Sequence, residues 1–158
     1  MTDKMNMTPF DLIMNVLPYG VYWKNEEGHI AGCNQAFAQM IGAVDRTIVI
    51  GKSFDELSMG IPPVSMIGPT DFLAIEQVED QAMTSLNHTG TTVIERLRPA
   101  FGRCWVRIDA HGYTDSNGHG GVLVICRDVT DQEKNLRDLK LATLKTEAPL
   151  FTFDDVSA

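Results

Sequence analysis

The chain of 158 residues is long enough for one domain with extensions, and 44% hydrophobic and 22% charged residues are values of a globular protein, which excludes wholesale disorder. Its net charge of −8 offers no basic stripe for a duplex, so we expect no direct contact with nucleic acid. The three cysteines form no Cys-x-x-Cys pair, so we expect reduced thiols in a cytoplasmic protein. No apolar run approaches the roughly 20 residues that span a bilayer, so we expect no membrane segment.

The first predicted element is a short amphipathic helix within an N-terminal extension, residues 1–16. Thr8 is placed to cap it, Pro9 suits its first turn, and Pro18 ends the segment. The apolar residues recur at helical spacing: Phe10, Ile13, Met14 and Leu17.

A β-hairpin and a second short helix follow. β-forming residues on both sides of a turn that contains Gly28 predict the hairpin. Asn34 is a good cap for the helix and Gly42 ends it, with Phe37 and Met40 on one side. Residues 43–66 are irregular and rich in Gly, Pro and Met.

A longer helix is predicted from Thr70, with Gly90 ending it. Ile75, Val78, Ala82 and Leu86 form its apolar line, and Glu76, Glu79 and Asp80 sit away from that line.

Three strands follow, at residues 91–98, 103–113 and 121–128. In the second strand Val106 and Ile108 share one face. The third is apolar on both faces, so both should be covered, and the N-terminal helix is a candidate cover for one of them.

The last predicted element is an exit helix from Asp131 to about Lys145. Thr130 and Glu133 have the spacing of a capping box, and Pro149 ends the segment. Leu136 and Leu139 give it a narrow stripe, enough for about two heptads of helix pairing.

This order of elements resembles a PAS domain. The stretches that carry the resemblance are VYWKNEEGHIAGCNQAF, IGKSFDEL and GGVLVICRDVTDQEK, where Asp128-Val129-Thr130 matches the motif that closes the last PAS strand. The resemblance implies an α+β fold: a five-stranded antiparallel sheet with helices on one face and flanking N- and C-terminal helices. We expect a helical extension at 1–16, the PAS domain at 17–130, a signalling helix at 131–148 and a tail, or the start of a following domain, at 149–158.

The resemblance implies a sensory and dimerisation module, not an enzyme, that signals through its C-terminal helix to an output domain of a bacterial transcription regulator or histidine kinase (two-component system). A small-molecule enzyme using the pocket, or a structural protein–protein interaction domain, is the alternative. An enzyme would need paired titratable groups facing inward, and the expected inward set has almost none. The ligand is unknown, and the candidate pocket residues are Phe37, Met40, Ile75, Val78, Val106, Ile108, Val124 and Cys126.

A homodimer through the flanking helices and the outer sheet face is expected. Asp128 and Thr130 are given structural roles at the start of the exit helix. The dimer and signalling candidates are Phe10, Ile13, Leu17, Trp105, Leu123, Ile125, Asp128, Thr130, Leu136 and Leu139.

No cofactor or metal is evident. Haem-binding PAS domains place a histidine in the long helix, and residues 72–86 contain none. Cys33 precedes Asn34, the wrong order for the reactive cysteine of flavin photochemistry; non-covalent flavin stays open. No histidine has a second ligand at metal-site spacing.

The C-terminal LFTFDDVSA resembles the entry segment of the ATPase domain in bacterial enhancer-binding activators. On that resemblance the chain is a fragment that ends at a domain boundary, and a simple tail is the alternative.

Overall fold

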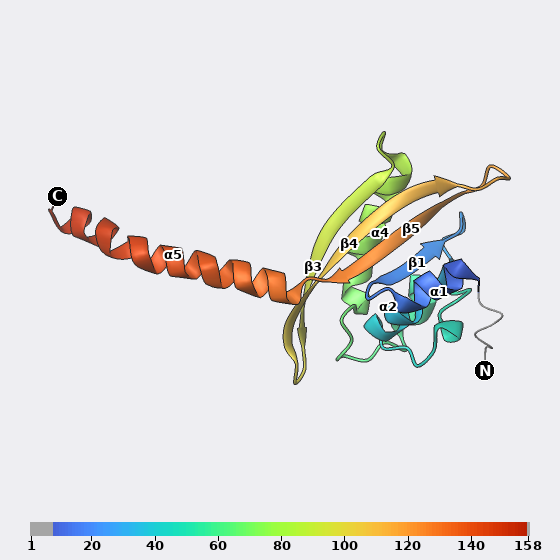
Figure 1. Ribbon diagram of the computed structural model, residues 1–158, viewed down its shortest axis with the longest axis horizontal. Helices are drawn as coiled ribbons and strands as arrows, with labels where there is room; N and C mark the ends of the chain where they lie inside the picture. The colour runs from blue at the N-terminus through green and yellow to red at the C-terminus, as the bar shows by residue number, and fades with distance from the viewer. Residues whose placement is uncertain (1–7, 158) are drawn as a thin grey trace. The chain divides into compact units, whose positions relative to one another are not determined.

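A computed structural model describes the backbone of residues 8–157 and the side chains of residues 8–145. The chain forms two compact units, one that ends at Asp128 and one that starts at Val129. Figure 1 shows the first unit as a sheet with helices and the second as a single helix.

The first unit is built on a five-stranded sheet with the order β2-β1-β5-β4-β3, every neighbouring pair antiparallel. The predicted fold is therefore confirmed. The strands are β1 (Gly20–Lys24), β2 (Ile30–Cys33), β3 (Thr89–Arg98), β4 (Gly102–Thr114) and β5 (Gly120–Asp128).

Two hairpins of the sheet turn by the same chemistry. Asn25 Oδ1 accepts the amides of Glu27 and His29 at 3.0 and 3.1 Å, and Gly28 has a φ of +81°. Asp115 repeats the arrangement towards Asn117 and His119, at 2.9 Å each. A side-chain oxygen that satisfies the turn amides, followed by a glycine in the left-handed region, is the local signal that places both turns.

Three helices cover the inner face of the sheet: α2 (Gln35–Met40), α3 (Phe54–Ser58) and α4 (Phe72–Thr84). Short 3₁₀ turns, η2 (Arg46–Ile48) and η3 (Pro69–Asp71), connect them. Asn34 caps α2 as expected, accepting the Phe37 amide at 3.0 Å. Because Asn34 is fully buried and also bonds Val21, Tyr19 and Met14, it ties three segments together.

The end of α4 differs from the sequence prediction. The helix stops at Thr84, so Leu86 lies beyond it with 98% of its surface exposed, and Gly90 belongs to β3. Gly90 is needed there for another reason: a Cβ would lie 2.5 Å from the Val78 carbonyl oxygen of α4. The glycine thus lets helix and strand approach closely.

On the opposite face of β1 lies α1 (Pro9–Val16), which starts with the predicted Thr8 cap: the Thr8 hydroxyl accepts the Asp11 amide at 3.1 Å. Phe10 meets Trp23 edge-on with ring centroids 6.0 Å apart. The indole in turn covers Gly32, where a Cβ would overlap it. Four apolar side chains of α1 remain more than half exposed: Phe10, Leu12, Ile13 and Val16.

The second unit is α5 (Thr130–Ser157). The helix begins at Thr130 itself, with the Glu133 amide bonded to the Val129 carbonyl at 2.9 Å. The predicted end at Pro149 is not seen, because the backbone stays helical beyond it. A proline leaves one helical carbonyl without its amide partner, and in an exposed helix water can take that bond. Among the helices of residues 8–157, none combines the length and the hydropathy of a membrane span.

Candidate functional site

The eight side chains expected to line a ligand pocket are all buried, none with more than 7% of its surface exposed. They belong to one packed cluster between the sheet and the helices. None borders the four principal cavities of the described residues, so their ligand role stays a prediction. They are Phe37, Met40, Ile75, Val78, Val106, Ile108, Val124 and Cys126.

The interior also holds a charged group of three residues, which we call the buried triad: Tyr22, Lys24 and Glu79. Lys24 Nζ lies 2.8 Å from Glu79 Oε1, and the Tyr22 hydroxyl donates to Glu79 Oε2 at 2.7 Å. Lys24 and Glu79 are 6% and 4% exposed. The carboxylate is therefore satisfied on both oxygens and shielded from water.

The buried triad corrects two expectations from the sequence. Glu79 does not sit away from the core, and the inward-facing set does include acid–base groups. The signals were present: Lys24 follows Tyr22 by two positions on a strand, and Glu79 follows Ile75 by four on a helix. Their charge obscured the pattern, since Lys and Glu are almost never fully buried unless paired.

Aromatic rings enclose the buried triad. Lys24 Nζ lies 3.4 Å from the centroid of the Phe54 ring, and Phe54 stacks on Phe72 with centroids 4.2 Å apart. Tyr22 contacts Phe37, with centroids 4.4 Å apart. Phe54 supplies a cation–π contact to Lys24, but the rings offer few other polar partners. The charges of Lys24 and Glu79 therefore compensate one another.

The electrostatics follow from this burial. Desolvation raises the pKa of the Glu79 carboxyl, while Lys24 and the Tyr22 hydrogen bond act in the opposite direction. Desolvation and the nearby Glu79 hold the pKa of the Tyr22 phenol well above its usual value.

A cavity of about 330 Å³ borders Lys24 and Glu79 of the buried triad, between the β1–β2 turn, the start of α3 and one side of α4. We call it the acidic cavity. Its one basic side chain is Lys24, and six carboxylates line it: Glu26, Glu27, Asp55, Glu76, Glu79 and Asp80. The arrangement favours a ligand with hydrogen-bond donors or positive charge.

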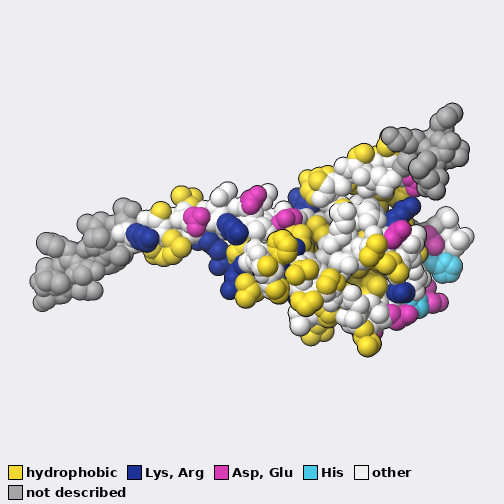
Figure 2. All heavy atoms as spheres, turned by 90° about the horizontal axis from the view of Figure 1, so that it is seen from below, with side chains coloured by type: hydrophobic (Ala, Val, Ile, Leu, Met, Phe, Trp, Pro, Cys, Tyr) yellow, Lys and Arg dark blue, Asp and Glu magenta, His cyan; other side chains and the backbone are white. Residues whose placement is uncertain are grey.

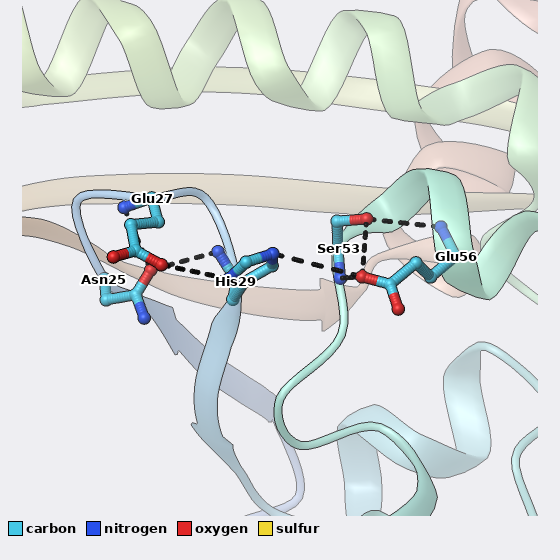
Figure 3. Close-up of polar contacts among 5 residues, drawn as sticks. All are labelled: Asn25, Glu27, His29, Ser53 and Glu56. Atoms are coloured by element: carbon cyan, nitrogen blue, oxygen red, sulfur yellow. Dashed lines mark hydrogen bonds and ion pairs between the residues drawn. The ribbon is translucent and has the colours of Figure 1, made fainter.

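Two walls of the acidic cavity are connected through His29, which Figure 3 shows between the β1–β2 turn and α3. His29 Nδ1 lies 3.6 Å from Glu27 and Nε2 lies 3.9 Å from Glu56, both ion pairs when the imidazole is protonated. Glu56 Oε1 also accepts from the amide and hydroxyl of Ser53, completing the capping box of α3. The contact therefore links the turn to the first residues of α3.

The cysteines are free thiols, all buried. Burial raises the pKa of Cys33 to about 11 and also raises the pKa of Cys104 and of Cys126. At neutral pH these thiols stay protonated and are poor nucleophiles. No group of three or more potential ligands in the described part of the chain could hold a metal ion.

The dimer and signalling candidates fall into separate environments. Leu123 and Ile125 of β5 are half-buried, and so is Leu17. Trp105 is an exception: only 5% of its surface is exposed, so it does not present the accessible surface expected of it. Asp128 is exposed at the end of β5, and Thr130 is half-buried. The others are exposed by 45% or more: Phe10, Ile13, Leu136 and Leu139.

Comparison with solved structures supports the fold. The VqmA dimer of Vibrio cholerae is similar with a TM-score of 0.62 and 18% identity, over 80% of this chain and 53% of that one. The chain thus spans about half the length of VqmA. A PAS domain from Colwellia psychrerythraea has a TM-score of 0.54 and 18% identity, over 76% and 93% of the two chains.

The PAS domain of BvgS from Bordetella pertussis has a TM-score of 0.51 and 24% identity, over 86% of this chain and 93% of that one. No curated protein matches the sequence. The family model for the PAS domain matches residues 18–131, well over half of the chain. The chain therefore belongs to the PAS-domain family, whose members are sensory modules.

Proposed function

We propose that this PAS domain senses a small molecule in the acidic cavity and passes the signal through α5 to an output domain. The observation that carries the proposal is the buried triad at the floor of that cavity. A buried ion pair is weak evidence for stability, because desolvation offsets most of its Coulomb attraction. Its placement under an opening to solvent supports a switching role instead.

A ligand with a donor or a positive charge would compete with Lys24 for Glu79. Lys24 belongs to β1 and Glu79 to α4, so the competition would alter the link between strand and helix. β1 pairs with β5 from Gly20 to Lys24, and β5 ends two residues before α5. Lys24 pairs with Val122 near the start of β5, so a change at Lys24 would reach the exit helix along the length of β5. A ligand can shift the two states only by its differential affinity for them.

The signalling unit is proposed to be a homodimer. Isolated helices as short as α1 are marginal in water, and its four exposed apolar side chains favour burial against a second copy. Figure 2 shows hydrophobic side chains exposed along α5 beside Lys and Arg. Leu136 and Leu139 are 45% and 66% exposed, which supports helix pairing there.

The output domain is proposed to be a transcription regulator or a histidine kinase of a bacterial signalling system. The VqmA dimer in the absence of target DNA is described as giving insight into the DNA-binding mechanisms of LuxR-type receptors, which supports the first choice. The net charge of −8 supports leaving DNA contact to that other domain. The free cysteines support a cytoplasmic location.

An enzyme is the rival from another class, since the buried triad supplies titratable groups. Each of its polar atoms is already satisfied within the triad, which favours the sensor. Turnover of a bound molecule that is lost in Glu79→Gln would favour the enzyme instead.

The proposal can be tested without knowing the ligand in advance. A thermal-shift screen of the purified chain would use amines, amides, heterocycles and DPO, the molecule bound by VqmA. A Met83→Trp variant serves for comparison, because Met83 lines the acidic cavity and a larger side chain there would narrow it.

A compound that stabilises the wild type but not Met83→Trp, and that changes the sedimentation of the dimer, supports the proposal. If every binder stabilises both proteins equally, the acidic cavity is not the sensory site. If binding at the cavity leaves sedimentation unchanged, the site does not signal through dimerisation.

A further inference from the structure

A second cavity lies on the other side of α3 and shares no lining residue with the acidic cavity. It has a volume of about 230 Å³, and we call it the α2–α3 cleft. It is lined by Ile41, Gly42, Ala43, Val44, Ile48, Val49, Lys52, Glu56, Leu57, Gly60 and Ile61.

Most of the side chains that line the cleft are apolar. Ile41 and Val49 at its floor are 2% and 0% exposed. Val44 and Ile48 at its rim are 89% and 45% exposed, which leaves large aliphatic groups facing water beside a hollow. Apolar surface arranged around a concavity is typical of a ligand site rather than of an inert surface.

One positive charge lines the cleft. The Lys52 side chain is half-buried and forms no ion pair or hydrogen bond with any residue in the described range. Its backbone is held in place, because the Lys52 carbonyl accepts the Ile30 amide of β2 at 2.9 Å and the adjacent Gly51 amide donates to Ile30 at 2.7 Å. The backbone at Lys52 is thus held beside an apolar hollow, and its ammonium has no counter-ion among the described residues.

The nearest acidic candidate does not neutralise it. Glu56 also lines the cleft, but its Oε1 accepts from Ser53 at 3.3 Å and faces His29 at 3.9 Å, as Figure 3 shows. No ion pair joins Lys52 to Glu56 or to another residue of the described range, so a ligand would supply the counter-charge.

From these contacts we propose that the α2–α3 cleft binds a small aliphatic carboxylate, with the carboxylate on Lys52 and the chain among Ile41, Val49 and Leu57. An apolar cavity of about 150 Å³ holds one benzene, so this cleft accommodates roughly eight to ten non-hydrogen atoms. That range corresponds to acids from hexanoate to octanoate. The site is separate from the acidic cavity, so its failure would leave the proposed function untouched.

Amide chemical-shift titration of the isotopically labelled chain tests the assignment. Linear carboxylates from butanoate to decanoate, and hexanamide as the uncharged match for hexanoate, are added at neutral pH. We expect shifts confined to residues 41–61, with affinity rising about two- to fourfold per methylene until the cleft is full. Hexanamide is expected to bind about tenfold more weakly, because it lacks the charge-assisted hydrogen bond.

Three variants separate the charge from the cavity. Lys52→Met removes the ammonium and should abolish the preference for hexanoate over hexanamide, whereas Lys134→Met removes an exposed charge from α5 and should change nothing. Gly60→Val partly fills the cleft, where a Cβ meets no atom closer than 3.8 Å, and should weaken both compounds.

Equal binding of acid and amide to the wild type would overturn the proposal. So would an acid preference that survives Lys52→Met, or shifts that map to the acidic cavity or the core.

Discussion

Replacing Lys24 with Met tests whether the buried triad depends on mutual charge compensation. The substitution keeps an unbranched side chain of similar length but leaves the Glu79 carboxylate with Tyr22 as its one remaining partner in the triad. Removing one member of a buried ion pair costs about 3–5 kcal/mol. Because Tyr22 still donates at 2.7 Å, we expect the lower end, about 3 kcal/mol of unfolding free energy. For a chain of this size that lowers Tm by roughly 6–12 °C.

The loss of unfolding free energy in Lys24→Met should depend on pH, and the raised pKa of Glu79 determines the direction of that dependence. The pKa of Glu79 is raised in the folded protein, so folding favours its protonated form. That contribution is complete below the unfolded-state pKa, about 4.3, and is lost as pH rises through the folded-state pKa. Without Lys24, which lowers the pKa of Glu79, the loss is larger. The gap between variant and wild type should therefore widen as pH rises through the folded-state pKa of Glu79 in the wild type.

Urea unfolding followed by circular dichroism between pH 5 and pH 8 measures both quantities. Adding Glu79→Gln to Lys24→Met removes the orphaned charge and should recover about half of the lost stability or more. Lys134→Met, at an exposed site, should stay within about 0.5 kcal/mol of wild type. A loss of unfolding free energy below about 1 kcal/mol in Lys24→Met would refute the reasoning. So would a further loss of stability at every pH when Glu79→Gln is added to Lys24→Met.

Three further outcomes are expected. The double variant Leu136→Glu/Leu139→Glu should sediment as a monomer at concentrations where wild type dimerises. If wild type and variant both sediment as monomers at tens of micromolar, the proposed helix pairing is wrong for this chain. Asn34→Ala should lower unfolding free energy by about 2–4 kcal/mol, because it removes a cap and leaves the Val21 amide unpaired; a urea midpoint equal to wild type would contradict this. Gly90→Ala should cost about 1–3 kcal/mol by pushing β3 from α4, and an unchanged Tm would show that the two elements separate freely.

Local signals explain most of what the sequence predicted. The turns at Asn25 and Asp115 rest on side-chain oxygens and glycines within four residues, and alternation in β4 indicates which side chains face inward. The five-stranded sheet was implied by the resemblance to the PAS domain, because the pairing of β1 with β5 joins residues about 100 positions apart.

Long-range contacts explain what the sequence missed. Lys24 and Glu79 are 55 positions apart, and each alone reads as a surface charge. Only the fold brings them together and makes their burial tolerable. The end of α4 was misplaced for a similar reason, because Gly90 serves contact with Val78 across two elements rather than ending a helix.

The stack of Gly32, Trp23 and Phe10 gives the protein an intrinsic optical reporter. Trp23 is half-buried between the second strand and α1, and Phe10 contacts its edge. If α1 leaves the sheet, the indole gains water on that side and its fluorescence emission moves to longer wavelength. The other tryptophan, Trp105, is on a different strand and already shielded. Steady-state emission can therefore follow the docking of the N-terminal helix in the unlabelled chain, during ligand addition or dilution of a dimer.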